Sequence, residues 1–185
     1  NFFKNNKKLK ILNIGRFTDQ KDHHTLLEAI KILKKKYKIN FILLIMGRGE
    51  NRNNIQNFIN KNNLNFNVKV IGFKKNPYKY IRHCNLFVLS SRFEGLPNVL
   101  LEAITLKKFV ISSNCPTGPS EILNNGKGGL LFKTGRPNDL AKKINYYHNN
   151  KKKLKKKNDF AYNNLNRFDL NTNLRKYFKV ITDLF

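Results

Sequence analysis

The sequence predicts an α/β domain built on a doubly wound, Rossmann-like parallel sheet of about six strands with flanking helices. Short apolar runs of the kind that form buried strands alternate with longer segments whose apolar residues recur at helical spacing. Such runs occur at residues 10–14, 41–46, 68–71, 86–89 and 109–112. The 185 residues, 40% of them hydrophobic, are enough for one core, so we expect one domain over residues 1–185.

The segments between these runs predict the helices. Asp22 is placed to cap a helix after the first run, and the prolines suit helix starts, because proline lacks the N–H that has no partner there. The helices are expected at the apolar positions Leu26, Leu27, Ile30, Leu33 and Tyr37, at Ile55, Phe58, Ile59 and Leu64, over residues 77–81, after Pro97, Pro119 and Pro137, and around residues 160–165.

The stretch 91–103 carries two carboxylates eight positions apart, Glu94 and Glu102. It follows the strand predicted at 86–89, and Gly95 permits a sharp turn out of that strand. At a rise of about 1.5 Å per helical residue, the two carboxylates should be roughly 10 Å or more apart. One small group therefore does not easily bind to both carboxylates.

The helix that follows Gly95 offers a site for phosphate between the two carboxylates. Pro97 is predicted at its first position. The free N–H groups of the first turn, around Asn98 and Val99, and the positive end of the helix dipole both favour an anion. A ligand with a phosphate in its middle and hydroxyls at each end could contact both carboxylates, and a nucleotide-sugar has that form.

A second group of candidate ligand-binding residues follows the first predicted strand. Gly15 and Arg16 leave the strand, and Lys21 stands just before the helix. Both basic side chains are therefore expected at the carboxyl end of a strand, where open α/β sheets bind ligands. A planar guanidinium and a mobile ammonium are suited to neutralising a diphosphate.

Together these features resemble the retaining glycosyltransferases of family 4, which have two Rossmann-like domains (the GT-B architecture). The resemblance rests on the Glu-x7-Glu motif from Glu94 to Glu102 and on the Gly15-Arg16 pair with Lys21 five positions after the arginine. Residues 115–122 resemble the Cys-Pro-x-Gly-Pro-x-Glu-Ile motif of enzymes that build surface polysaccharides and lipid-linked oligosaccharides. Residues 126–132 resemble the family's final strand, which brings the expected strands to six.

The resemblance implies roles for individual residues. Glu94 is the expected catalytic residue, near the sugar ring and its hydroxyls, and Glu102 is expected to bind the ribose hydroxyls of a UDP- or GDP-sugar. The expected donor-binding residues are Gly15, Arg16, Lys21, Gly72, Phe73, Gly95, Leu96, Pro97, Asn98, Val99, Glu102 and Glu121. The family is generally independent of metal, and the sequence has no Asp-x-Asp site and no dinucleotide fingerprint, so we expect no metal and no cofactor.

Two of these assignments have an alternative, and a neighbouring histidine pair needs a separate interpretation. Gly72-Phe73 either meets the nucleotide base, as the resemblance implies, or is a strand-end turn with a core phenylalanine. Glu121 is expected to shape the donor pocket or to cap a helix. His23 and His24 are interpreted as the start of a helix and not as catalytic groups.

The formal net charge of +26 allows a different class of function. A basic, non-catalytic module that binds nucleic acid or an anionic membrane would explain the charge, but not the two carboxylates or the Gly15–Lys21 pattern. The lysine runs at 34–36, 151–153 and 155–157 fall at ends or outer faces of predicted helices. We therefore interpret them mainly as a solvated surface. The alternatives, in decreasing order, are binding to an anionic membrane surface, to an anionic lipid-linked acceptor and to nucleic acid.

The remaining features bear on location and completeness. Cys84 and Cys115 have no metal-binding spacing and are interpreted as small reduced core residues of a cytoplasmic protein, which could lie peripherally on the inner face of the membrane. The apolar residues Leu174, Tyr177, Phe178, Ile181, Leu184 and Phe185 predict a terminal helix. The resemblance implies that this helix packs on an N-terminal acceptor-binding domain, the first half of the enzyme; packing on its own domain is the alternative.

Overall fold

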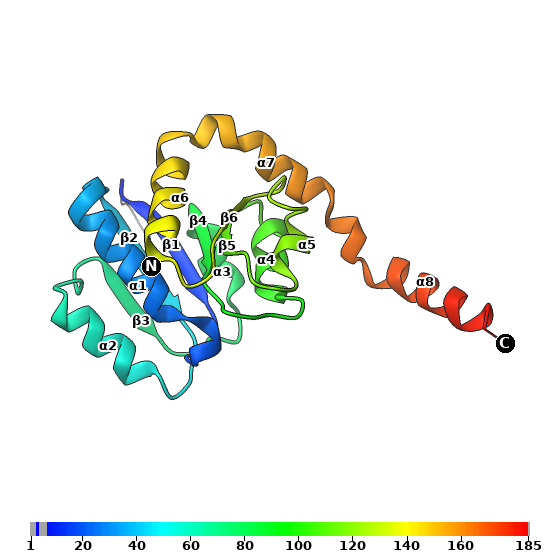
Figure 1. Ribbon diagram of the computed structural model, residues 1–185, viewed down its shortest axis with the longest axis horizontal. Helices are drawn as coiled ribbons and strands as arrows, with labels where there is room; N and C mark the ends of the chain where they lie inside the picture. The colour runs from blue at the N-terminus through cyan, green and yellow to red at the C-terminus, as the bar shows by residue number, and fades with distance from the viewer. Residues whose placement is uncertain (1–2, 4–6, 185) are drawn as a thin grey trace.

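The computed structural model describes residue 3 and residues 7–184 and has a single six-stranded sheet, all of whose strands are parallel (Figure 1). The strand order is β3-β2-β1-β4-β5-β6, which is the doubly wound arrangement that the sequence predicts. The strands are β1 (Leu9–Ile14), β2 (Phe41–Met46), β3 (Val68–Ile71), β4 (Leu86–Leu89), β5 (Phe109–Ser113) and β6 (Leu130–Phe132).

Helices cover both faces of this sheet. They are α1 (His23–Ile32), α2 (Arg52–Lys61), α3 (Tyr78–His83), α4 (Asn98–Thr105), α5 (Pro119–Ile122), α6 (Pro137–Asn149), α7 (Lys151–Asn163) and α8 (Leu170–Thr182). A π-helical turn, Leu33–Tyr37, extends α1, and short 3-10 helices occur at Asp19–Lys21 and Leu165–Phe168. Helix α1 begins as predicted, because the Asp22 carboxylate accepts a hydrogen bond from the Thr25 N–H at 3.1 Å.

Alternation along the strands divides the core into two layers. Successive side chains of a strand point to opposite faces, so Ile11 and Leu43 pack with the α1 and α6 side, and Leu12 and Leu44 pack with the α4 side. All four of these side chains are at most 1% exposed. Both cysteines are free and buried, in agreement with the sequence-based interpretation.

Two helix boundaries differ from the sequence-based predictions. Leu64 lies beyond α2, which ends at Lys61, because Asn63 takes a left-handed backbone conformation with φ of 53° and turns the chain. Leu64 is nevertheless fully buried. Its apolar character therefore reflects burial in the turn before β3 and not a place in the helix. Pro97 is the N-cap of α4 and not its first residue, because its ψ of 95° is extended rather than helical.

The terminal helix α8 extends away from the sheet and its flanking helices (Figure 1). None of its described residues is buried, and Tyr177 and Phe178 are more than 60% exposed. The alternative, that part of this stripe packs on its own domain, is therefore wrong for the described part of the helix, and packing on an N-terminal domain stays a prediction; Phe185, the last residue of the predicted stripe, lies outside the described residues. None of the described helices is long and apolar enough to span a bilayer.

Candidate functional site

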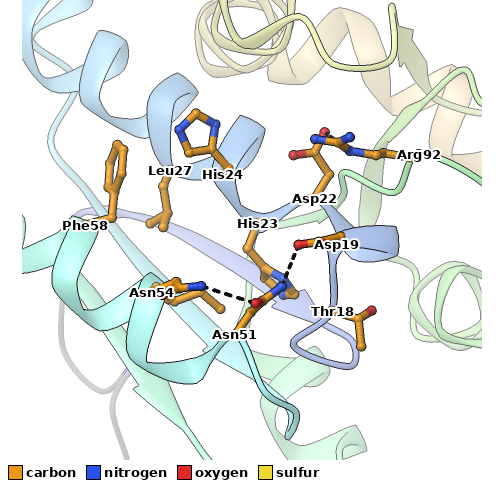
Figure 2. Close-up of a pocket in the computed structure, with 11 residues that line it drawn as sticks. Thr18, Asp19, Asp22, His23, His24, Leu27, Asn51, Asn54, Phe58 and Arg92 are labelled. Carbon is orange, nitrogen blue, oxygen red and sulfur yellow. Dashed lines mark hydrogen bonds and ion pairs between the residues drawn. The ribbon is translucent and has the colours of Figure 1, made fainter.

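The loops after β1 and β4 lie side by side at the point where the strand order reverses, which is where open α/β sheets bind ligands. The Arg92 side chain approaches the Asp22 carboxylate, with Nε and Oδ2 3.5 Å apart (Figure 2). The Arg92 N–H donates to the Gln20 carbonyl at 2.8 Å, and the Gln20 amide donates to the Phe93 carbonyl at 3.0 Å. These bonds hold the Gly15–Lys21 segment against the loop that carries Glu94.

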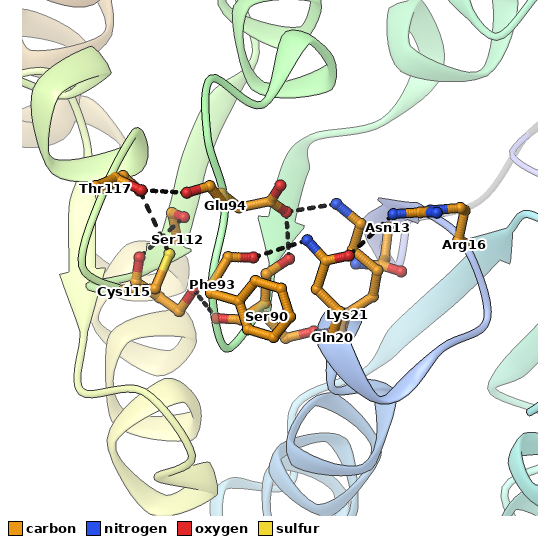
Figure 3. Close-up of polar contacts among 12 residues, drawn as sticks. Asn13, Arg16, Gln20, Lys21, Ser90, Phe93, Glu94, Ser112, Cys115 and Thr117 are labelled. Atoms are coloured by element: carbon orange, nitrogen blue, oxygen red, sulfur yellow. Dashed lines mark hydrogen bonds and ion pairs between the residues drawn. The ribbon is translucent and has the colours of Figure 1, made fainter.

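Lys21 and Glu94 form the central contact between the two loops. Lys21 Nζ lies 2.6 Å from Glu94 Oε1, and the two side chains are only 14% and 6% exposed (Figure 3). The Ser91 hydroxyl donates to the same carboxylate oxygen at 2.5 Å, and the Thr117 hydroxyl donates to the Glu94 carbonyl. The carboxylate is thus held in one position by the ammonium group of Lys21 and the hydroxyl group of Ser91.

A cavity of about 430 Å³ opens near the ends of β1, β2 and β3, and we call it the donor cavity; Lys21 and Glu94 are not among the residues that line it. Five of the residues predicted to bind a donor line it: Gly15, Arg16, Phe73, Val99 and Glu102. They come from the ends of β1 and β3 and from α4, segments that are far apart in the sequence. The structure therefore brings these predicted residues together around one space.

Glu102 presents an unsatisfied acceptor at this cavity. Its Oε2 atom is buried and has no hydrogen-bond partner among the described residues, and burial raises the pKa of the carboxyl group above its usual value. A buried acceptor without a partner costs roughly 1–3 kcal/mol. A ligand hydroxyl that donates to Glu102 would remove this cost.

The start of α4 supplies backbone donors beside the same cavity. Pro97, as the N-cap, accepts a bond from the Leu100 N–H at 2.9 Å, which leaves Asn98 and Val99 in the first turn. The first N–H groups of a helix have no partner within it and attract anions. Val99 lines the cavity, whereas Asn98 is exposed and is not among the residues that line it.

The other predicted residues lie around the cavity or away from it. Gly95 and Leu96 are exposed on the loop before α4, and Gly72 directly follows β3. Glu121 is exposed in the first turn of the short helix α5 and is not among the residues that line the donor cavity. The side chain of Phe73 is 62% exposed, so the interpretation of Phe73 as a core residue is wrong.

Arg48 is a cavity residue that the sequence did not single out as a binding residue. Its guanidinium carbon lies 5.4 Å from the centre of the Phe73 ring, and both side chains line the donor cavity. A guanidinium held over an aromatic ring is partly pre-organised and still has N–H donors to offer. Its position between Gly47 and Gly49, directly after the buried strand β2, was the signal available in the sequence.

His23 occupies a buried position at the first residue of α1. Burial lowers the pKa of its imidazole from 6.5 to about 4, and the nearby Lys21 adds to this effect while Asp22 opposes it. The unfolded chain binds a proton below pH 6.5, whereas the folded protein does so only near pH 4. The folded state is therefore undisturbed above pH 6.5 and loses stability as the pH falls towards 4.

This pKa difference predicts a measurable loss of stability in mild acid. We expect His23 to lower the free energy of unfolding by about 3 kcal/mol between pH 6.5 and pH 4, at about 1.4 kcal/mol per pKa unit. Urea titrations at pH 7.0 and 4.5 should show a smaller loss for His23→Phe than for the unsubstituted chain. His24→Phe, at an exposed neighbouring position, should behave like the unsubstituted chain; equal losses in all three would contradict the prediction.

Comparison of the sequence with known proteins finds one matching family and several relatives. The sequence model of the glycosyl transferases group 1 family matches residues 1–167. A capsular polysaccharide biosynthesis glycosyltransferase of Staphylococcus aureus, CapH, is 33% identical over 175 residues, which are 92% of this chain and 47% of CapH. An N-acetylgalactosaminyltransferase of Campylobacter jejuni that acts on a diphospho-undecaprenol-linked saccharide is 33% identical over 130 residues, 70% of this chain and 34% of that enzyme.

A solved glycosyltransferase structure has the same fold as this chain over most of its length. The structure of S. aureus TarM in complex with UDP, fondaparinux and α-GlcNAc-glycerol superimposes with a TM-score of 0.85 at 26% identity, over 93% of this chain and 35% of TarM. The chain thus spans between about a third and a half of the length of these relatives. The family match over most of the chain, together with this fold, shows that the chain belongs to the glycosyl transferases group 1 family.

Proposed function

We propose that this chain is the donor-binding domain of a retaining glycosyltransferase of the GT-B type, which takes a UDP- or GDP-sugar as its donor. The observation that carries the proposal is the donor cavity, which gathers a basic side chain, a helix N-terminus and an unsatisfied carboxylate at the switch point of the sheet. UDP is the first nucleotide to test, because TarM, 26% identical to this chain, has a structure in complex with UDP.

The charges around the cavity suit the departure of a nucleoside diphosphate. Negative charge grows on the leaving phosphate as the bond to the sugar breaks. In our proposal Arg16, Lys21 and the first N–H groups of α4 stabilise this charge where it develops. Because these groups supply the positive charge, we expect no requirement for a divalent metal ion.

The two glutamates have different roles in this proposal. Glu102 accepts hydrogen bonds from the ribose hydroxyls through its unpartnered oxygen. Glu94 is the catalytic residue, close to the sugar, where positive charge develops on the ring. Lys21, which neutralises Glu94 in the absence of ligand, turns to the diphosphate when the donor binds and leaves the Glu94 carboxylate for the sugar hydroxyls.

The acceptor is proposed from the relatives rather than from the cavity. CapH is named for capsular polysaccharide biosynthesis, and the C. jejuni relative acts on a lipid-linked saccharide. We infer a surface-polysaccharide or lipid-linked oligosaccharide acceptor, held by an N-terminal domain of the same enzyme that precedes this chain. The expected location is the cytoplasm, with the exposed lysines of α7 available to an anionic membrane surface.

Nucleotide binding tests this proposal directly. UDP should raise the melting temperature of the chain at physiological salt, since a ligand that binds only the folded state stabilises it. Arg16→Ala should weaken UDP binding through loss of a charged phosphate contact. Glu102→Gln should weaken it by about tenfold or more through loss of a charge-assisted hydrogen bond, and should itself raise the melting temperature without ligand because it removes a buried charge.

Matched titrations identify the alternatives. GDP tests the base, and EDTA should leave the UDP response unchanged if no metal is required. A random oligonucleotide tests the alternative of a basic, non-catalytic module, whose binding should fall steeply as salt rises. A salt-sensitive response to the oligonucleotide, with none to UDP or GDP, would overturn the donor-domain proposal.

A further inference from the structure

A second cavity, which shares no lining residue with the donor cavity, lies between the beginnings of α1 and α2 (Figure 2). We call it the α1–α2 cavity. Its volume is about 200 Å³, several times the roughly 30 Å³ that one water molecule occupies in the liquid. It is also smaller than the roughly 300 Å³ at which sites for drug-sized ligands begin. The space therefore fits one small ring-shaped molecule better than a nucleotide.

Buried polar atoms without partners gather at this cavity. Both ring nitrogens of His23 and the hydroxyl of Thr18 are buried and have no hydrogen-bond partner among the described residues, and both residues line the cavity. The His23 side chain is only 4% exposed. Unpaired buried groups of this kind cost about 1–3 kcal/mol each, and a native structure keeps them mainly where they have a use.

The polar side of the cavity is built as a connected set of groups. The Asn51 amide donates to the Asp19 carboxylate at 2.7 Å, and the Asn54 amide donates to Asn51 Oδ1 at 3.3 Å (Figure 2). These bonds fix side chains from the β1–α1 loop and from the beginning of α2 in one arrangement. One carboxylate and two amides thus form a continuous row along this wall.

The opposite side of the cavity is apolar. Leu27 from α1 and Ile55 and Phe58 from α2 form it, and the Phe58 ring also makes an edge contact with His24, with ring centres 5.6 Å apart. An aromatic and aliphatic wall across from amides and a carboxylate suits a molecule with one apolar face and hydroxyls at its edge. A sugar ring has those two surfaces.

The charged side chains at the cavity disfavour an anion and a cation as its ligand. Asp19 and Asp22 repel an anion such as phosphate, and the Arg92 side chain, 3.5 Å from Asp22, opposes a cation. A neutral imidazole has one donor and one acceptor nitrogen, and a hydroxyl group can both accept and donate. The groups that lack partners are thus complementary to neutral hydroxyls.

From this geometry we infer that the α1–α2 cavity binds a single neutral sugar residue, a unit of the glycan on which the enzyme acts. The identification of the ligand as part of that glycan rests on the proposed function. The sugar would pack its C–H face on Phe58 and exchange hydrogen bonds with Asn54 and, after a small movement of the ring, with His23. This site is separate from the donor cavity, because no residue lines both cavities.

Ligand-observed NMR on the 185-residue chain can test this inference with methyl α-glucoside, methyl α-galactoside and methyl N-acetyl-α-glucosaminide. Saturation transfer to at least one glycoside is expected, and an excess of UDP should not displace it. Asn54→Ala should weaken the binding by at least tenfold, because it removes an amide from the polar wall. Asn57→Ala is the matched control, since Asn57 is exposed on the same helix and does not line the cavity.

His23→Phe provides a second and independent readout. It should abolish the glycoside signal while raising the melting temperature, because it removes two unpaired nitrogens and keeps a ring of similar size. Absence of saturation transfer with every glycoside, as expected for a cavity that holds only water, would overturn the inference. So would displacement by UDP, or equal effects of Asn54→Ala and Asn57→Ala. Failure of the proposed function would appear differently, as glycoside binding without any response to UDP or GDP.

Discussion

Replacing Glu94 by alanine is expected to lower the free energy of unfolding by about 3–5 kcal/mol, because it leaves the largely buried Lys21 ammonium without its partner. For a chain of this size the melting temperature should fall by roughly 10 °C or more. The loss of the hydrogen bond from Ser91, 2.5 Å long, adds to the effect. Chemical denaturation and calorimetry of the purified variant would measure it.

A surface ion pair in the same chain is the matched control. Glu28 and Lys31 are 3.4 Å apart, with side chains about 30% exposed, so Glu28→Ala should cost at most about 1 kcal/mol. Equal losses in the free energy of unfolding for Glu94→Ala and Glu28→Ala would show that the Lys21–Glu94 pair stabilises the fold no more than a surface ion pair does.

Ligand binding separates the two members of the buried pair. If Lys21 turns to the diphosphate, Lys21→Met should weaken UDP binding by about tenfold or more, whereas Glu94→Gln should leave UDP binding unchanged or strengthen it, because Lys21 is no longer held by a carboxylate. The loss with Glu94→Gln should then appear in the binding of the sugar part of a UDP-sugar. A loss of UDP binding with Glu94→Gln and none with Lys21→Met would contradict the assigned roles.

Gly47→Ala is expected to have the second large effect, because this position has no room for a side chain. A Cβ atom on Gly47 would lie 1.8 Å from the carbonyl oxygen of Gly15 and 2.9 Å from the Phe17 ring. The loops after β1 and β2 would have to separate, at a cost of about 3 kcal/mol in the free energy of unfolding. Because Gly15 and Gly47 both line the donor cavity, UDP binding should weaken as well.

Gly72→Ala is the control for this substitution. Gly72 also follows a strand at the same edge of the sheet, but a Cβ atom there meets nothing within 4 Å among the described residues. Thermal melts and UDP titrations of both variants should show a large change for Gly47→Ala and a small one for Gly72→Ala. Similar behaviour of the two would mean that the loops adjust without cost and that the close approach is unimportant.

The central strands and the start of α1 were the most predictable parts of the fold. The run Phe41–Met46 is a strand with the predicted bounds, because a stretch of six apolar residues is fully buried in a parallel sheet. Asp22 caps α1 as predicted, since its carboxylate bonds to a backbone N–H three residues along. These features depend on interactions within a few residues, which a sequence pattern displays.

The errors occurred at a turn that the apolar spacing does not reveal and at surfaces whose partners lie elsewhere in the chain. Leu64 was assigned to a helix because it continued the apolar spacing, but the left-handed backbone of Asn63 ends that spacing. Phe73 could not be classified from its neighbours, and its exposure depends on the cavity and on Arg48 from another loop. The stripe on α8 was correctly predicted as amphipathic, yet periodicity cannot tell which surface such a face will cover.

The sequence by itself determined the alternation of strands and helices, the resemblance to a glycosyltransferase family and the residues expected around a donor. Those conclusions rest on local periodicity and on motifs whose members lie close together in the chain. Only the tertiary structure decided that Lys21 pairs with Glu94, that Glu102 has an unpartnered oxygen, and that His23 and Thr18 border a second cavity. Lys21 and Glu94 are 73 residues apart in the sequence. Only tertiary packing brings such distant segments together, and no local sequence pattern contains that information.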